Sequence, residues 1–189
     1  KHLGIARRAE HGIELRVHPT LIPEEQLIAN VNGVKNAVLV QAHAVGPTLY
    51  YGAGAGAGPT ASAVVADIVD IVRDISYTED GAGTIPQLAF EALTDLPILK
   101  REEMTTGYYL RVDAEDQTGV LADITTILSR AGISIDAIMQ QSRLKDLIPI
   151  VILTDPVVES KMDDAIAKIQ ALPAIHGEIV RIRLESLDS

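Results

Sequence analysis

A glycine-rich stretch between a β-favouring run and a segment of helical periodicity places the strongest local constraint on this chain. Residues 48–51 favour a strand, and four glycines then occupy every second position from Gly52 to Gly58. Glycine lets a backbone adopt positive φ angles and lets another group approach without meeting a Cβ atom. The apolar segment follows Pro59-Thr60, where proline suits the first helical positions and the Thr60 or Ser62 hydroxyl can cap free N–H groups. The stretch therefore predicts strand, tight loop and helix, with a helix N-terminus that favours anions.

Two other interpretations of this stretch remain open. Alternating glycine and alanine also occur in flexible connectors, although a connector does not need ordered elements so close on both sides. The order Gly52-Ala53-Gly54, followed by Ala55 and Ala57, approaches the dinucleotide fingerprint G-x-G-x-x-G/A. That fingerprint requires a second parallel strand, ending in an acidic residue, after the helix. Residues 75–86 are instead polar and broken by glycine and proline, so the sequence does not favour a Rossmann turn.

The segment before the glycines contains three short predicted strands. Apolar and polar residues alternate over residues 12–18, which predicts a half-buried strand whose polar face is wet. The residues on its apolar face are Ile13, Leu15 and Val17. Residues 37–40 are apolar throughout and predict a more buried strand, and residues 48–51 form the third. Because the long helical crossovers of parallel sheets are missing between them, we expect an antiparallel sheet.

The segment after Thr60 predicts an amphipathic helix with a single apolar stripe, which requires a cover. The stripe consists of Val64, Ile68, Ile71 and Val72. The periodicity then decays, so residues 76–104 are interpreted as a linker between a first domain, residues 1–75, and a second domain, residues 105–189. Within the linker, the charged residues 100–103 predict a solvated surface.

In the second domain, segments with the alternation of strands and segments with helical spacing follow one another regularly. Apolar alternation and helical spacing predict, in chain order, a strand at 108–112, a helix at 120–128, strands at 133–141 and 147–154, a helix at 162–172 and a strand at 180–184. The order βαββαβ is that of a ferredoxin-like sandwich. Its helices cover one face of the sheet, so self-association through the other face is expected. The predicted fold class is therefore α+β, with a partial antiparallel-sheet domain and a helix followed by this sandwich.

The composition excludes several classes of function. The 189 residues carry a net charge of −10 and no basic run, so nothing favours a nucleic acid or an anionic membrane surface. The absence of cysteine excludes disulfides and thiolate chemistry and fits a cytoplasmic protein. We recognise no signal peptide and no apolar run long enough to span a bilayer. Because the first residue is Lys1 and not methionine, we expect a piece of a longer protein.

Residues 51–67 closely resemble the segment that ends the catalytic domain of homoserine dehydrogenases. The matching residues are Tyr51-Gly52-x-Gly54-Ala55-Gly56-x-x-Pro59-Thr60-Ala61-Ser62-Ala63-Val64-Val65-Ala66-Asp67. The match extends upstream through Gly4-Ile5-Ala6-Arg7-Arg8, His18-Pro19-Thr20-Leu21-Ile22-Pro23, Asn32-Gly33-Val34-x-Asn36-Ala37-Val38 and Gly46-Pro47-Thr48. The resemblance implies an oxidoreductase that interconverts L-aspartate 4-semialdehyde and L-homoserine with NAD(P)H, in the biosynthesis of threonine and methionine.

In that family the glycine loop lies against the nicotinamide end of the cofactor. The resemblance therefore implies a cofactor contact at Gly54, with Gly52, Gly56, Pro59 and Thr60 as supports. The family's dinucleotide-binding domain and catalytic lysine match no position of this sequence. We consequently assign no catalytic residue and expect the chain by itself to be inactive.

Residues 105–189 resemble the ACT domain, a small-molecule sensor that often regulates enzymes of amino-acid metabolism. The resemblance rests on Leu110-Arg111-Val112-x-Ala114-x-Asp116-x-x-Gly119-Val120-Leu121-Ala122-Asp123-Ile124, Leu128, Ala131-Gly132-Ile133-Ser134-Ile135 and Met139-Gln140-Gln141. In the family, an effector amino acid binds between paired domains, against the loop into the first helix and the second strand. The implied positions are Asp113, Asp116, Thr118, Gly119, Val120, Leu121, Ile133 and Asp136. The pathway implies L-threonine as the effector.

The chemistry of that loop is compatible with an amino acid, but a simpler interpretation stays open. Backbone N–H groups at the helix start would receive a carboxylate, and neighbouring aspartates its ammonium. The alternative is a capped helix entry with solvated acids. Thr118-Gly119 stands where many relatives have Pro-Gly, so the loop has less rigidity than theirs.

Other chemistry has little support in the sequence. The five histidines show no metal-ligand spacing, so no metal site is expected. Ser62 lies at a helix start, where capping is the expected role. The sequence thus predicts the C-terminal part of a homoserine dehydrogenase that assembles as a homo-oligomer. The alternative is a stand-alone amino-acid-sensing module without catalysis, for which the first half has no evident use.

Overall fold

The structure, a computed structural model, describes residues 1–77, 95–140 and 147–187. Its contacts divide the chain into two compact units, which are Lys1–Pro23 with Leu96–Asp188, and Glu24–Asp95. The division differs from the predicted boundaries because the first strands pair with the second half of the chain; those boundaries stay a prediction. Most of the predicted linker, residues 78–94, lies outside the described residues, as does Gln141 of a predicted strand.

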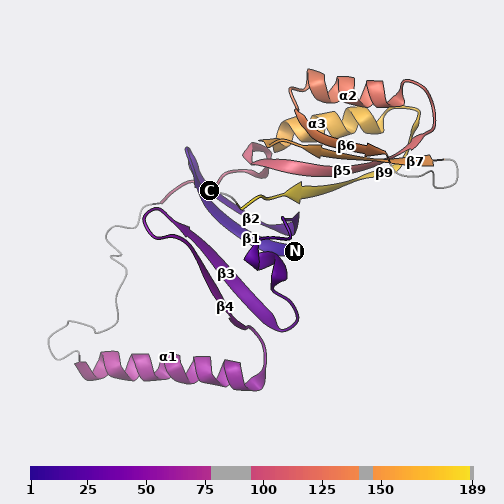
Figure 1. Ribbon diagram of the computed structural model, residues 1–189. Coiled ribbons are helices and arrows are strands. Elements are labelled where there is room, and N and C mark those ends of the chain that lie inside the picture. Colours follow the sequence, from indigo (N-terminus) through magenta and orange to yellow (C-terminus); the bar gives the residue numbers. More distant parts are fainter. Residues whose placement is uncertain (78–94, 141–146, 188–189) are drawn as a thin grey trace. The chain divides into compact units, whose positions relative to one another are not determined.

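The first unit is built on one sheet of seven strands (Figure 1). The strands are β1 (His2–Ala9), β2 (Gly12–Leu21), β5 (Thr105–Glu115), β6 (Ile135–Gln140), β7 (Leu147–Thr154), β8 (Val157–Val158) and β9 (Ile175–Leu184). Their order is β1-β2-β9-β5-β7-β6, with β8 paired to β5. The segment from β9 to β6 has the strand order of a ferredoxin-like sandwich, which confirms the predicted fold of the second half. The β1–β2 hairpin extends this sheet, because β2 runs parallel to β9 where Thr20 lies opposite Arg183.

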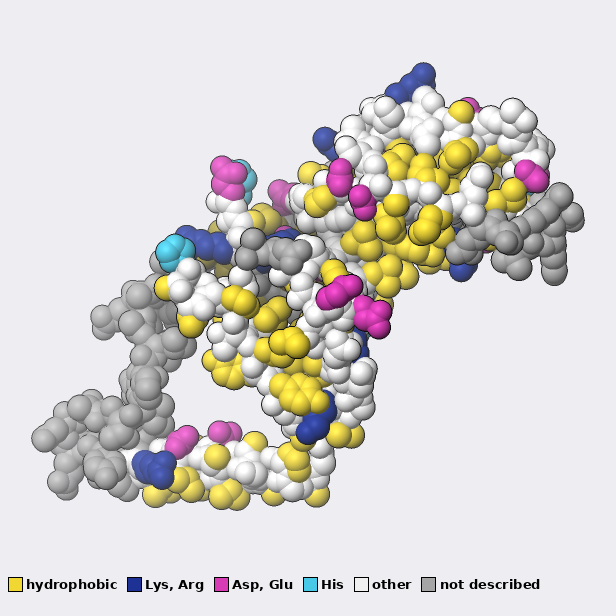
Figure 2. Space-filling view, in the orientation of Figure 1, with side chains coloured by type: hydrophobic (Ala, Val, Ile, Leu, Met, Phe, Trp, Pro, Cys, Tyr) yellow, Lys and Arg dark blue, Asp and Glu magenta, His cyan; other side chains and the backbone are white. Residues whose placement is uncertain are grey.

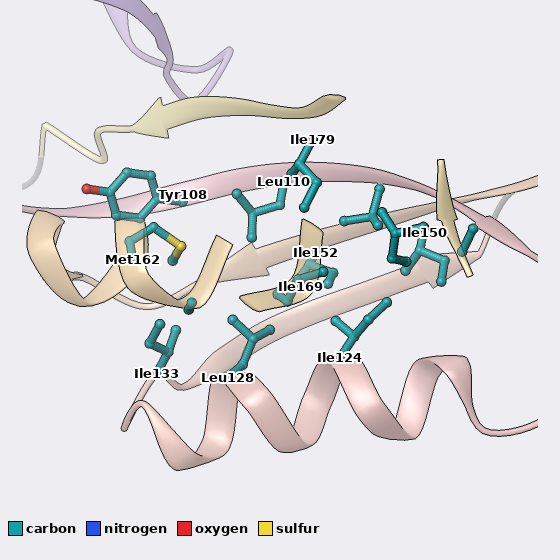
Figure 3. Packing of buried hydrophobic residues seen from close by; sticks show 14 of the residues in the cluster. Tyr108, Leu110, Ile124, Leu128, Ile133, Ile150, Ile152, Met162, Ile169 and Ile179 are labelled. Atoms are coloured by element: carbon teal, nitrogen blue, oxygen red, sulfur yellow. The ribbon is translucent and has the colours of Figure 1, made fainter. Parts of the chain in front are cut away.

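Two helices, α2 (Val120–Arg130) and α3 (Glu159–Gln170), cover one face of the sheet and enclose the core. Strand β5 supplies Tyr108, Leu110 and Val112, all fully buried, as their alternation predicts. The helices contribute buried residues at helical spacing to the same core, among them Ile124, Leu128, Met162 and Ile169 (Figure 3). Each fully buried aliphatic side chain of this size contributes roughly 1.5–3 kcal/mol. The core of the described chain is therefore the core of this sandwich.

The β1–β2 hairpin buries the face that the sequence predicted to be wet. Glu14 and Arg16 are 4% and 7% exposed, whereas Leu15 and Val17 are 45% and 71% exposed. Alternation shows that a strand has an apolar and a polar face, but it does not show which face is buried. Here the polar face is buried because it lies against oppositely charged groups elsewhere in the unit. The prediction of a wet polar face is wrong for this strand.

The second unit is a two-stranded ribbon followed by a long helix. Its elements are the short 3-10 helix η1 (Leu27–Asn30), β3 (Lys35–Ala42), β4 (Gly46–Ala53) and α1 (Ala57–Tyr77). The ribbon is antiparallel, as predicted, but residues 12–18, which were expected in the same sheet, pair with β1 in the first unit. Residues 37–40 were expected to be buried, but Val38 and Val40 are exposed because no other layer of this unit's described residues covers them. The apolar stripe of α1 is likewise more than half exposed, and Figure 2 shows hydrophobic side chains along that helix.

Candidate functional site

The glycine segment brings Gly54 into close contact with Asn36. The Gly54 N–H donates to the Val34 carbonyl at 3.1 Å, which continues the ribbon by one residue beyond β4. A Cβ atom on Gly54 would lie 1.5 Å from Nδ2 of Asn36, so the Asn36 side chain occupies the space that any other residue would need. A Cβ at position 54 would therefore force the Asn36 side chain to move, whether or not a ligand binds.

An open hollow of about 320 Å³ lies beside this contact. It is lined by Asn36, Ala37, Val38, Tyr50, Tyr51, Gly52, Ala53 and Gly54. Two of the five predicted cofactor contacts, Gly52 and Gly54, thus border the hollow. At Gly52 nothing lies within 4 Å of the place of a Cβ, so the backbone there is open to the approach of a flat group, whereas at Gly54 the Asn36 side chain fills that place.

The other three predicted cofactor positions shape the start of α1. Gly56 has a φ of 122°, a conformation that L side chains rarely adopt. The Thr60 N–H donates to the Gly56 carbonyl at 3.1 Å and so closes the first turn, which also contains Pro59. The helix begins at Ala57, two residues before Pro59, where the sequence predicted its start.

A cavity of about 390 Å³ lies at the predicted effector loop, where β5 leads into α2. Of the predicted residues, Thr118 and Val120 line it, with Gly119 between them. Gly119 has a φ of 100° at the helix start, and the Asp123 N–H donates to its carbonyl at 2.9 Å. The remaining lining residues are Glu115, Gln117, Asp123, Leu172, Pro173 and Ala174. On the edge of the cavity, His176 Nε2 lies 2.7 Å from Glu115 Oε1.

The other predicted effector positions do not line that cavity. Asp113 lies within β5, and Asp136 is exposed on β6. Ile133 is buried in the hydrophobic core, where it packs with residues of both helices. Asp116 and Leu121 flank the loop but line no part of the cavity. Within one protomer, the structure therefore gathers only the loop residues 118–120 of the predicted set.

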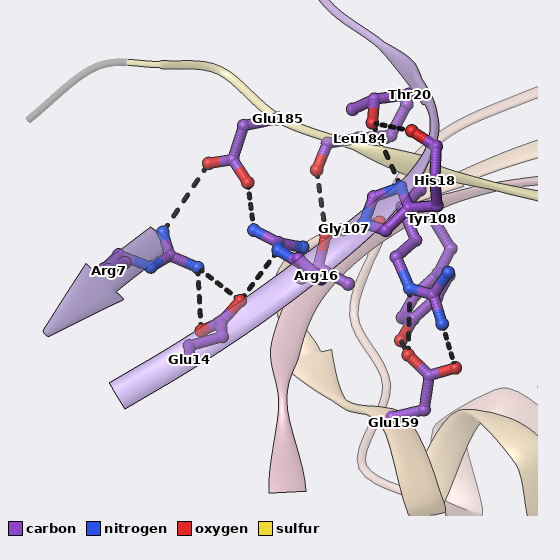
Figure 4. Close-up of polar contacts among 12 residues, drawn as sticks. Arg7, Glu14, Arg16, His18, Thr20, Gly107, Tyr108, Glu159, Leu184 and Glu185 are labelled. Carbon is purple, nitrogen blue, oxygen red and sulfur yellow. Dashed lines mark hydrogen bonds and ion pairs between the residues drawn. The ribbon is translucent and has the colours of Figure 1, made fainter. Parts of the chain in front are cut away.

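Sequence reasoning missed a buried ionic cluster around Glu159, the first residue of α3. Its carboxylate has no exposed surface and accepts hydrogen bonds from the Tyr108 hydroxyl at 2.7 Å and from Arg183 Nε at 3.0 Å. Arg181 Nη2 lies 3.5 Å from the same carboxylate, as does Arg101 Nη1 from η4 (Arg101–Glu103). Figure 4 shows the Glu159 carboxylate beside Tyr108. Four cationic or hydroxyl donors from three elements therefore converge on one acid.

The charges of this cluster fix the protonation of Glu159. Burial alone would raise the pKa of its carboxyl, but hydrogen bonds from Arg183 and Tyr108 and the positive charges of Arg183 and Arg181 outweigh burial and lower it. Burial and the Glu159 carboxylate together raise the pKa of the Tyr108 hydroxyl. The carboxyl is thus ionised and the hydroxyl remains a donor.

The sequence contained one signal for this cluster. Arg181 and Arg183 alternate with apolar residues along β9, and core-facing charges need partners. Residues 100–103 were expected to form a solvated surface, and they are exposed, with 54% of the Arg101 side chain accessible. The pairs of Arg101 with Glu159 and, at 3.1 Å, with Asp163 were not expected.

A second ionic cluster joins the hairpin to the end of β9. Arg7 Nη2 lies 3.2 Å from Glu14 Oε2, and Arg7 Nη1 lies 3.5 Å from Glu185 Oε1. Arg16, whose side chain is 3% exposed, approaches Glu14 at 2.8 Å and also pairs with Glu185 (Figure 4). The two carboxylates and two guanidiniums alternate, so each charge has an opposite neighbour in this poorly hydrated place.

His18 lies between the two ionic clusters. Its Nδ1 is 3.0 Å from the Thr20 hydroxyl oxygen. Burial, and then the charges of Arg183 and Arg16, lower the pKa of the imidazole below its usual 6.5, although the Pro19 carbonyl acts in the opposite direction. Its Nε2 atom is buried without a hydrogen-bond partner among the described residues. A neutral ring is the form that this position favours.

Metal-binding clusters and membrane-spanning helices are both missing from the described residues. Among the described residues, no group of three or more histidine, aspartate or glutamate side chains is placed to hold a metal ion. Across the same residues, no helix combines the length and the apolar character that crossing a membrane requires.

Comparison with known proteins gives consistent matches over both halves of the chain. Residues 1–69 match the family model described as homoserine dehydrogenase, and residues 108–174 match that of the ACT domain. The homoserine dehydrogenase of Pseudomonas aeruginosa is 55% identical over 192 residues, which cover 100% of this chain and 44% of that protein. That of Neisseria gonorrhoeae is 51% identical over 190 residues, which cover 99% of this chain and 43% of that protein.

A solved structure supports the same comparison. The crystal structure of a homoserine dehydrogenase from Thiobacillus denitrificans shares 57% sequence identity and superposes with a TM-score of 0.90, covering 100% of this chain and 42% of that one. The chain therefore spans less than half the length of the relatives that it matches.

Proposed function

Because the chain belongs to the homoserine dehydrogenase family, we propose that it is the C-terminal part of an NAD(P)-dependent enzyme that interconverts L-aspartate 4-semialdehyde and L-homoserine. The observation that carries this proposal is the 55% identity to a homoserine dehydrogenase across the whole chain. The match includes both halves, so it does not support the alternative of a stand-alone sensing module. The reaction would belong to the biosynthesis of threonine and methionine, in the cytoplasm.

In this proposal the chain helps to hold the cofactor and leaves the chemistry to residues outside it. The nicotinamide cofactor, when bound, supplies the hydride that reduces the aldehyde carbon to an alcohol. Gly52 and Gly54 form a strip of backbone that lines the hollow, and the open space at Gly52 suits the approach of a flat ring. Gly56, Pro59 and Thr60 set the turn that positions this strip relative to the start of α1. Gly54 is the proposed contact, and the other four are its supports.

The proposal is tested by comparing the 189-residue chain with a longer protein that also carries the dinucleotide-binding and catalytic segments of its relatives. With L-homoserine and NADP⁺ or NAD⁺, the longer protein should reduce the cofactor and the 189-residue chain should not. If the longer protein is inactive with NADP⁺ and also with NAD⁺, the proposed dehydrogenase activity is refuted. Hydride transfer by the 189-residue chain alone would refute the proposal that the catalytic residues lie outside it.

We further propose that the ACT half binds L-threonine at the loop between β5 and α2. The cavity of about 390 Å³ lies at this loop, and the first turn of α2 offers free N–H groups to a carboxylate. Calorimetric titration of the chain with L-threonine, and with L-serine and L-isoleucine as controls, tests the effector. Saturable binding of threonine alone, weakened by Gly119→Ala, is expected; equal binding of all three would contradict a threonine sensor.

A homo-oligomer is the proposed assembly, because one face of the sandwich sheet has no helical cover. On that face Tyr109 of β5 lies between Leu153 of β7 and Ile182 of β9, all partly exposed. Burying such a row in a subunit interface is favourable. Light scattering after size-exclusion chromatography should give at least twice the chain's 20.2 kDa, and Leu153→Glu should lower that mass.

A further inference from the structure

One face of the ribbon formed by β3 and β4 carries an amide side chain beside two glycines. Asn36 lies opposite Gly52, and Val38 lies opposite Tyr50. Opposite residues of an antiparallel pair project to the same face, and so does every second residue along a strand. Gly54 belongs to this face too, because it follows Gly52 by two positions and its N–H continues the hydrogen bonding of the ribbon. The face therefore combines one amide, glycine backbone and two apolar side chains.

The amide of Asn36 lies over the backbone of Gly54. Its Nδ2 atom is 1.5 Å from the place that a Cβ on Gly54 would take, and its Cγ atom is 2.4 Å from that place. Asn36 and both glycines of this face line the hollow of about 320 Å³. The amide thus lies at the hollow, in a place that is free only because position 54 carries no Cβ.

The hydrogen-bonding groups of this amide are not used within the described chain. The Asn36 side chain is exposed and makes no hydrogen bond with any residue that the structure describes. A primary amide offers two N–H donors and one carbonyl acceptor. On the same face, Val38 and Tyr50 are 60% and 64% exposed. Apolar side chains together with an amide that has no partner can bind a flat ligand and fix its orientation.

The nicotinamide ring matches these features, because it is flat and carries one primary carboxamide. Two primary amides can pair through two hydrogen bonds, in which each N–H group donates to the carbonyl of the other amide. We propose that Asn36 recognises the carboxamide of the nicotinamide, while the open backbone at Gly52 accommodates the ring. This inference rests on the proposed function and deepens it, because it names the side chain that gives the cofactor contact its specificity.

The test has to separate the two ends of the cofactor. Adenine also matches an asparagine amide, through its amino group and the neighbouring ring nitrogen. Two cofactor analogues distinguish the ends. In the 3-acetylpyridine analogue a methyl group replaces the NH₂ of the carboxamide, and in the hypoxanthine analogue an oxygen replaces the amino group of adenine. Each analogue leaves the other end of the cofactor unchanged.

Calorimetric titration of the longer protein, without substrate, measures the Kd of the natural cofactor and of each analogue. The unchanged protein should bind the natural cofactor about tenfold more tightly than the acetylpyridine analogue, as expected for one lost hydrogen bond. In Asn36→Ala the natural cofactor loses both hydrogen bonds and the analogue loses only the one it still had. The ratio of the two Kd values should therefore fall toward one. A purely structural role of Asn36 would weaken both ligands equally and leave the ratio unchanged.

Two other variants separate the amide from its surroundings. Gly54→Ala places a Cβ where the Asn36 amide lies, so it should displace the amide and lower the same ratio. Gln41→Ala removes an exposed amide of the same strand that does not line the hollow, and this matched control should leave each Kd unchanged. Asn36 and Gln41 are both exposed, so the fold should persist in both alanine variants, which the midpoint of thermal unfolding checks.

The outcomes differ for this inference and for the proposed function. If the ratio in Asn36→Ala equals that of the unchanged protein, the role of Asn36 is overturned, while the dehydrogenase activity is judged separately. If Asn36→Ala lowers the discrimination against the hypoxanthine analogue and not against the acetylpyridine analogue, the amide contacts adenine and the inference is likewise overturned. If the longer protein binds neither NADP⁺ nor NAD⁺, the proposed function and this role of Asn36 both fail.

Discussion

The hydroxyl of Tyr108 donates a 2.7 Å hydrogen bond to the carboxylate of Glu159, and neither side chain has exposed surface. Tyr108 belongs to the central strand β5 and Glu159 to the first turn of α3, so the bond fixes the helix start against the sheet. Arg183 of β9 binds the same carboxylate. A single buried charge therefore determines how three elements of the sandwich meet.

Removing the charge of Glu159 should destabilise the fold strongly. Glu159→Gln leaves Arg183 without a counter-charge, whereas Arg181 keeps its pair with Asp163, and breaking a buried ionic pair costs about 3–5 kcal/mol of unfolding free energy. Tyr108→Phe removes one hydrogen bond and should cost about 1 kcal/mol. Urea denaturation measures both. The control Glu102→Gln should stay within about 0.5 kcal/mol, and an equally small effect at Glu159 would show that the cluster contributes nothing.

Stability should fall on mild acidification because of His18. The pKa of His18 in the folded chain lies below its usual 6.5, so near that pH the unfolded chain binds the proton more readily. The stabilisation is therefore complete above pH 6.5 and is lost as the pH falls toward the lowered pKa. The urea concentration at the unfolding midpoint should decrease as the pH is lowered across this range. The decrease should be smaller in His18→Gln. Parallel curves for the two proteins would assign the dependence to other groups.

A substitution at Gly54 should be harmful only while Asn36 is present. A Cβ at position 54 would collide with the Asn36 amide, so Gly54→Ala should lower stability by about 1 kcal/mol or displace the amide. In an Asn36→Ala background the same change should cost much less. Thermal unfolding of the unchanged chain, the two single variants and the double variant gives the coupling free energy between positions 36 and 54. Gly52→Ala is the control, since a Cβ there has nothing within 4 Å; additive effects would exclude the collision.

The start of α2 should not tolerate a side chain at Gly119. Its φ of 100° is a left-handed conformation that costs L-residues roughly 1–2 kcal/mol, so Gly119→Ala should lower the midpoint of thermal unfolding. Gly58→Ala is the matched change in α1, where the added Cβ meets open space and the helix gains up to about 1 kcal/mol. Circular dichroism measures the midpoint of thermal unfolding of both variants. Equal midpoints for the two variants would show that Gly119 is not strained.

The resemblance carried by the glycine motif and by the βαββαβ pattern is confirmed by the comparisons, and the burial of one face of β5 was predictable from its alternation. Tyr108, Leu110 and Val112 alternate on one strand, and a strand with one covered face must bury that set. The ionic clusters were not predictable in the same way, because an arginine on a strand gives no indication of which acid it will meet.

The sequence by itself indicated most of the elements, though not β1 or β8, since the periods of helices and strands and the demands of glycine and proline act over a few neighbouring residues. Only the tertiary structure decided that the β1–β2 hairpin joins the second half of the chain and buries its polar face. The physical reason is the partner of that face: Arg16 is neutralised by Glu185, which lies 169 positions away, and a charge can be buried only where such a partner is brought to it.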